Sequence, residues 1–66
     1  MNLIINGENK TFQEGDTLSF IIQSLQIEDK VMAAAVNMDI VKKDQWSQCI
    51  LRENDTIELL QFVGGG

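Results

Sequence analysis

The first residues of the chain alternate between apolar and polar faces. Within residues 1–5, Ile4 falls on the opposite side of an extended segment from its apolar neighbours. Asn6-Gly7 follows, and this dipeptide supplies the positive φ angles that a two-residue type I′ hairpin turn needs. We therefore predict a β-hairpin whose returning strand covers residues 10–13.

One amphipathic helix is predicted after the hairpin. Its apolar residues recur at i, i+3, i+4 and i+7, which places them on one helical face. They are Leu18, Ile21, Ile22 and Leu25. Asp16 or Thr17 can cap the first turn, because the side-chain oxygen of either residue accepts a hydrogen bond from the helix N-terminus.

The middle of the chain allows two interpretations. Residues 31–36 contain three alanines, and alanine favours a helix. We predict a strand instead, because the segment is short, has valines at both ends and runs into a turn-like sequence. Ile40-Val41 then predicts a short strand, and Trp46 falls on a predicted helical turn that Asp44 caps.

The last predicted strand covers residues 56–63 and follows a turn at Asn54-Asp55. Because side chains alternate along a strand, Ile57 and Leu59 should face the helix. Leu60 and Phe62 should then lie on the uncovered face of the sheet. Ile4 joins them if the first strand lies beside the last.

This uncovered face is a candidate docking patch for a partner protein. Exposed apolar residues that lie together commonly mark interaction sites. The alternative is that a loop of the same chain covers Leu60 and Phe62. In either case the order of elements predicts an α+β domain, with a mixed four- to five-stranded sheet packed on one helix.

Composition excludes several classes of protein. The chain has 66 residues, enough for one domain, and it contains no histidine, so triads and metal sites that need histidine are ruled out. Its single cysteine, Cys49, cannot form an internal disulfide. Cys49 has no neighbouring base to activate it, so we expect an inert, buried thiol rather than a sulfur relay. We expect no bound metal and no catalytic side chain.

Charge and hydropathy narrow the expected partners. Ten acidic and five basic residues give a net charge of −5, which disfavours nucleic acid and anionic membranes and suits a basic protein partner. No apolar run reaches the roughly 20 residues of a membrane span. The N-terminal residues lack the features of a signal peptide. These observations predict a cytoplasmic protein.

The chain ends in Gly64-Gly65-Gly66, directly after the last predicted strand. We therefore divide it into a folded domain at residues 1–63 and a flexible tail at residues 64–66. Glycines add nothing to a core, but their narrow backbone can enter a channel that excludes side chains. The alternative is a frayed end with no function.

Together these features resemble the ubiquitin-like β-grasp fold and, more narrowly, the ThiS family of sulfur carriers in thiamine biosynthesis. The resemblance spans the whole chain and rests on several short segments. They are Ile5-Asn6-Gly7-Glu8, Glu14-Gly15-Asp16-Thr17-Leu18, Ala35-Val36-Asn37, Ile40-Val41 followed by Trp46, Asn54-Asp55-Thr56-Ile57-Glu58 and the terminal Gly65-Gly66. Two segments differ from the family pattern: Lys42-Lys43 replaces Pro-Arg, and Asn54 replaces a glycine.

The resemblance implies a protein that partner enzymes act upon. A ubiquitin-activating-type adenylyltransferase would use ATP and magnesium to adenylate the carboxylate of Gly66, while Gly64 and Gly65 enter the partner's channel. A cysteine desulfurase or another sulfur donor would then convert the adenylate into a thiocarboxylate. Thiazole synthase would take the sulfur from Gly66.

Two alternative functions share parts of this pattern. The small subunit of molybdopterin synthase has the same fold and the same thiocarboxylate chemistry, although such subunits tend to be longer. A ubiquitin-like modifier or a simple binding module would also present an exposed face and a glycine tail. The spacing from Ile40-Val41 to Trp46 fits the thiamine carrier better.

Overall fold

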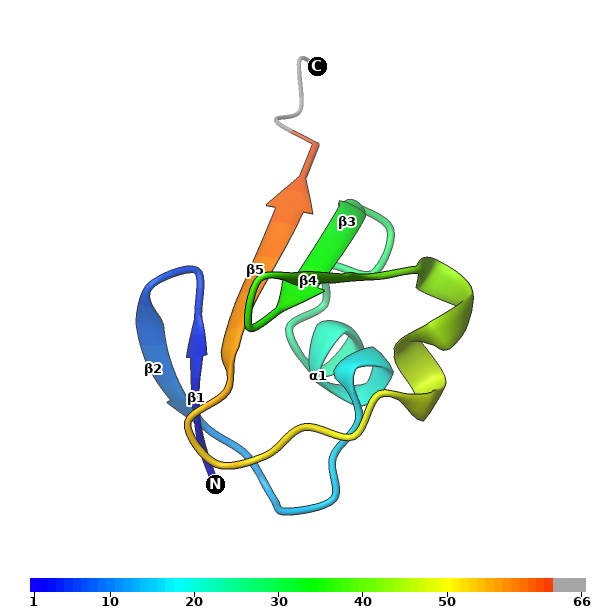
Figure 1. The fold of residues 1–66 in the computed structure, drawn as a ribbon. Coiled ribbons are helices and arrows are strands. Elements are labelled where there is room, and N and C mark those ends of the chain that lie inside the picture. The colour runs from blue at the N-terminus through cyan, green and yellow to red at the C-terminus, as the bar shows by residue number, and fades with distance from the viewer. Residues whose placement is uncertain (63–66) are drawn as a thin grey trace.

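The structure is a computed structural model that describes residues 1–62. Five strands form one sheet, and an α-helix and a short 3₁₀ helix complete the fold (Figure 1). In chain order the elements are β1 (Asn2–Ile5), β2 (Glu8–Thr11), α1 (Leu18–Ser24), β3 (Val31–Val36), β4 (Asp39–Val41), η1 (Lys43–Gln48) and β5 (Thr56–Gln61). This arrangement confirms the predicted α+β class.

The first hairpin turns where the sequence predicts. Asn6 and Gly7 have φ angles of 49° and 84°, as a type I′ turn requires. The returning strand, however, covers Glu8–Thr11, so the prediction of residues 10–13 was wrong by two residues. The turn uses only two residues, and the strand ladder therefore resumes at once with Glu8 opposite Ile5.

Helix α1 begins at the predicted cap. Thr17 has an extended backbone, and its hydroxyl oxygen accepts a hydrogen bond from the Phe20 N–H at 3.1 Å. The Asp16 carboxylate instead accepts from the Gln13 N–H, which closes the preceding turn. Three residues of the predicted apolar face are fully buried, and the fourth, Leu25, is half-buried at the C-terminal end of the helix.

The sheet has the strand order β2-β1-β5-β3-β4. β5 lies at its centre, parallel to β1 and antiparallel to β3, so the sheet is mixed. The segment 31–36 is a strand, as predicted, and it contains a β-bulge between Val31 and Ala33. Asn54 has a φ angle of 69° in the turn before β5, so asparagine supplies the left-handed conformation that the family pattern assigns to glycine.

The segment after β4 forms the predicted helical turn at Trp46, which is the 3₁₀ helix η1. The prediction that Asp44 caps it was wrong, because Lys42 occupies the cap position and makes no side-chain hydrogen bond there. Asp44 lies inside the first turn, where a negative charge faces the positive end of the helix dipole.

The core lies between the sheet and the two helices. The strands contribute Leu3, Ile5, Val31, Ala34, Ile57 and Leu59, and the helices and the loop after η1 contribute Leu18, Ile21, Ile22, Trp46 and Leu51. No polar side chain is buried among residues 1–62. No helix in this part of the chain has the length and apolar character needed to cross a bilayer.

Candidate functional site

The two faces of β5 differ as the alternation predicts. Ile57 and Leu59 are buried in the core, with relative exposures of 0% and 6%. Leu60 and Phe62 are each 61% exposed on the other face of the sheet. Their exposure within the described chain shows that no loop of residues 1–62 covers them, so the alternative of an intramolecular cover is not supported there.

Residues of β3 and β4 extend this exposed face. Ala33 pairs with Leu60, and Ala35 lies between Glu58 of β5 and Ile40 of β4. We use the name outer apolar face for Met32, Ala33, Ala35, Ile40, Leu60 and Phe62. Besides Phe62, its three large side chains are well exposed to solvent: Met32, Ile40 and Leu60 have relative exposures of 54%, 74% and 61%.

The centre of the outer apolar face is a shallow hollow of about 360 Å³. The small side chains of Ala33 and Ala35 leave room between Leu60 and Ile40, which also line the hollow. Glu58 is exposed at its rim. The surface therefore offers a partner an apolar centre with a negative charge beside it.

Ile4 lies on the same face but not beside Leu60. It pairs with Thr56 at the first residue of β5 and is half-buried. Leu60 follows Thr56 by four steps along the strand, which corresponds to about 13 Å. The sequence therefore placed Ile4 in the docking patch, whereas the residues that lie next to Leu60 come from β3 and β4.

Sequence reasoning missed the contribution of Met32 and Ile40. The face of Met32 depends on the bulge at Val31 to Ala33, and a bulge leaves no signal in a run of apolar residues. Ile40 does alternate with half-buried Val41, and that signal was available in the sequence.

The predicted reactive tail, Gly64 to Gly66, lies outside the described residues. β5 ends at Gln61, and Phe62 is the last residue that the structure describes. Two members of the outer apolar face, Leu60 and Phe62, therefore lie within four residues of Gly64 in the chain.

Cys49 is half-buried, just after η1. Burial, and to a lesser extent the nearby Asp55 carboxylate, raise the pKa of the Cys49 thiol above its ordinary value. Because the thiolate is the reactive form, this environment opposes a role as a nucleophile at neutral pH.

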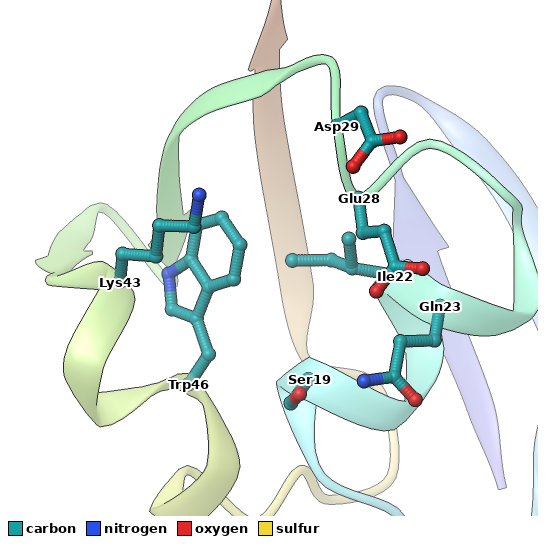
Figure 2. A pocket seen from close by; sticks show the side chains of 7 residues that line it. All are labelled: Ser19, Ile22, Gln23, Glu28, Asp29, Lys43 and Trp46. Carbon is teal, nitrogen blue, oxygen red and sulfur yellow. The ribbon is translucent and has the colours of Figure 1, made fainter.

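Trp46 closes a second pocket, of about 270 Å³, between α1 and η1 (Figure 2). Its indole N–H donates a hydrogen bond to the Val41 carbonyl at 2.9 Å, and the residue is only 5% exposed. The Lys43 ammonium lies 5.9 Å from the ring centroid, while Glu28 and Asp29 line the opposite wall in Figure 2. Trp46 is therefore part of the core, and the Lys43 ammonium lies over its ring.

A model of the ThiS family matches residues 3–66. The sulfur carrier protein ThiS of Escherichia coli strain K12 is 30% identical over 66 residues, which cover all of both chains. The chain belongs to the ThiS family. A crystal structure of the thiamine biosynthesis protein ThiS from Geobacter metallireducens has the same fold, with a TM-score of 0.82 at 24% identity and full coverage of both chains.

A second kind of relative is much longer than this ThiS-family chain. The thiazole synthase of Paramagnetospirillum magneticum is 32% identical over 66 residues, but the chain covers only 20% of that protein. In that relative, a segment similar to this whole chain is joined to a larger polypeptide.

Proposed function

We propose that this chain carries sulfur for thiamine biosynthesis as a thiocarboxylate on Gly66 and delivers it to a thiazole synthase. The observation that carries the proposal is the family match, which extends through the glycines to Gly66. The two kinds of relative, one named a sulfur carrier and the other a thiazole synthase, support both halves of it.

The chemistry begins with a carboxylate that must be activated. An α-carboxylate has a pKa near 3.5, so it is ionised at neutral pH and resists nucleophilic attack. In the proposed first step, an oxygen of Gly66 attacks the α-phosphorus of ATP on a ubiquitin-activating-type adenylyltransferase, and pyrophosphate leaves. Magnesium and ATP belong to that partner enzyme, and this chain supplies only the carboxylate.

Sulfur then replaces the activated oxygen. The terminal sulfur of a persulfide, formed on a cysteine desulfurase or another donor, attacks the carbonyl carbon of Gly66, and AMP leaves with the electron pair of the broken C–O bond. A thiol then attacks the donor's cysteine sulfur in the resulting acyl disulfide, the S–S bond breaks, and the thiocarboxylate leaves with its electron pair while the thiol and the donor cysteine form a disulfide. No side chain of this chain takes part, in agreement with the raised pKa of the Cys49 thiol.

The outer apolar face is the proposed docking surface for the adenylyltransferase. Phe62 directly precedes the segment that leads to the glycines, so a protein that holds the tail also lies close to this face. The exposed side chains of Leu60 and Phe62 can enter pockets of such a partner, and Glu58 at the rim suits a basic residue there.

The thiamine pathway is favoured over the alternatives. The family match names ThiS rather than the small subunit of molybdopterin synthase. A protein modifier would require attachment of Gly66 to lysine side chains of target proteins, whereas the thiazole synthase relative points to transfer of sulfur to a small molecule.

Reconstitution tests the proposal. The chain is incubated with the adenylyltransferase of the same organism, ATP, magnesium and a persulfide donor, and its mass is followed. We expect release of pyrophosphate and then an oxygen-to-sulfur exchange that depends on ATP. A chain without Gly66 is the control, and sulfur loading of that control would contradict the proposal.

A further inference from the structure

One edge of β5 is left open in the segment that leads to the glycines. On the side of β1, strand pairing covers only Thr56 and Ile57. The chain then turns away at Asn6, whose backbone N–H donates to the Ile57 carbonyl at 2.9 Å. In Figure 1 the upper part of β5 extends beyond this turn, where β3 lies beside it on one side and β1 no longer lies beside it on the other.

The Asn6 side chain closes the next position of this edge. Its Oδ1 accepts a hydrogen bond from the Leu59 N–H at 2.8 Å, and its Nδ2 donates to the Leu59 carbonyl at 3.2 Å. The side-chain amide therefore takes the place that a further residue of β1 would occupy. No strand among residues 1–62 continues along this side beyond Leu59.

Gln61 is the next residue along this edge of β5, beyond the Leu59 backbone groups that the Asn6 amide binds. Backbone groups of alternate strand residues point to the same edge, so those of Gln61 point the same way as those of Leu59. The next residue confirms this direction, because the Phe62 N–H donates on the opposite side, to the Lys30 carbonyl. Gln61 thus presents its N–H and C=O at an open edge.

An apolar hollow lies next to this open edge. It measures about 240 Å³ and lies on the helix side of the sheet, away from the outer apolar face. Its apolar walls are Ile5, Leu25, Ile27 and Leu59. Glu8 and Lys10 also line it, and their side chains form an ion pair at 3.7 Å that leaves little net charge.

We propose that this open edge binds an extended segment of the thiazole synthase. The segment pairs through its main chain with Gln61 and places one apolar side chain in the hollow. This is β-strand addition, in which backbone hydrogen bonds supply affinity and a side-chain pocket supplies selectivity. The inference rests on the proposed function, because it concerns the partner that receives the sulfur.

The position of the edge favours this occupant. Gly64 is three residues from Gln61, a reach of at most about 10 Å, so a synthase that holds the glycines comes within contact distance of the edge. In the Paramagnetospirillum relative, a segment similar to this chain is part of a longer protein named thiazole synthase, so the two are covalently joined there. The balanced charge of the hollow selects an uncharged side chain.

Amide hydrogen exchange tests the edge directly. In the isolated chain, we expect the Gln61 amide to exchange fast while the Phe62 amide, bonded to Lys30, is protected. Addition of the thiazole synthase of the same organism should slow exchange at Gln61 at least tenfold. Fast exchange at Gln61 in the complex would overturn the proposal, as would protection that appears in the isolated chain at high concentration, because the occupant would then be a second copy.

A single-atom substitution provides the matched experiment. A chain of 66 residues can be made by chemical synthesis, and an ester bond between Leu60 and Gln61 replaces the Gln61 N–H with an oxygen that cannot donate a hydrogen bond. One hydrogen bond of typical net strength corresponds to a loss of about three- to tenfold in affinity for the synthase.

The far edge of the sheet supplies the control. Asn9 lies on edge strand β2 and pairs with Ile4, whose N–H points away from β2 toward Asp55. The Asn9 N–H therefore faces outward at the opposite edge, and an ester there should leave affinity unchanged. Equal losses for both esters, or no loss at Gln61, would reject the proposal. Thiocarboxylate formation on the adenylyltransferase is measured separately, so failure of the edge leaves the proposed function intact.

Discussion

Truncation of Leu60 and Phe62 tests the proposed docking face most sharply. We expect the double variant Leu60→Ala, Phe62→Ala to bind the adenylyltransferase much more weakly while it keeps its fold. Both side chains are 61% exposed, so most of their apolar surface is available to a partner rather than to the core.

The magnitude follows from this exposure. Complete burial of a Leu or Phe side chain is worth about 1.5–3 kcal/mol, so burying the exposed 61% of both gives about 2–3.5 kcal/mol. At 1.4 kcal/mol per factor of ten, the dissociation constant should rise about 30- to 300-fold. The smaller part that is already buried limits the loss of folding free energy to about 1–2 kcal/mol.

Calorimetric titration with the adenylyltransferase and thermal unfolding give the two readouts. The matched control is Phe20→Ala, Ile50→Ala, because these side chains are 51% and 62% exposed and lie on α1 and after η1, outside the outer apolar face. The control should bind normally. Unchanged binding by the Leu60 and Phe62 variant would reject the docking face, and a loss of folding free energy well above 2 kcal/mol would place these residues in the core.

Three further predictions concern other parts of the chain. Extension of the chain beyond Gly66 should abolish sulfur loading in the mass assay, because it removes the free carboxylate, and Gly65→Val should do the same, because it adds a branched side chain to the tail. Neither change should alter the melting temperature. Sulfur loading of an extended, unprocessed chain would contradict this prediction. Cys49→Ala should retain sulfur transfer. The raised pKa of Cys49 favours the neutral thiol in the folded state, so ionisation of this thiol destabilises the wild-type chain only at a pH above the ordinary thiol pKa. Denaturation at several pH values should therefore show the wild-type chain losing stability relative to Cys49→Ala only in that range. Met38→Gly should raise the free energy of unfolding, measured in urea, by about 1 kcal/mol, because the Met38 φ angle of 73° is unfavourable for a residue other than glycine. A decrease would show that the exposed Met38 side chain stabilises the hairpin.

Local signals in the sequence predicted much of the fold. The Asn6-Gly7 turn, the Thr17 cap and the two faces of β5 each depend on one or two residues and their immediate neighbours, and each appears in the structure. The choice of a strand for residues 31–36 was also correct, against the helical preference of its alanines. There the pairing with β5 outweighs intrinsic propensity.

Features that depend on pairing between distant segments escaped the sequence. The place of Ile4 beside Thr56 follows from the register of β1 against β5, and the exposure of Met32 follows from a bulge. The open edge at Gln61 arises because the Asn6 turn ends β1 before β5 ends, and the Asn6 amide then bonds to a residue 53 positions away. No local pattern encodes these relations.

The central claim, that Gly66 carries sulfur, is tested most directly by the intact mass of the protein isolated from cells that lack thiazole synthase, where the loaded carrier should accumulate. The account predicts a species heavier by one oxygen-to-sulfur exchange, with fragmentation placing the added mass on the terminal residue. A protein that carries only the unmodified carboxylate under these conditions, or one whose added sulfur maps to Cys49, would contradict it.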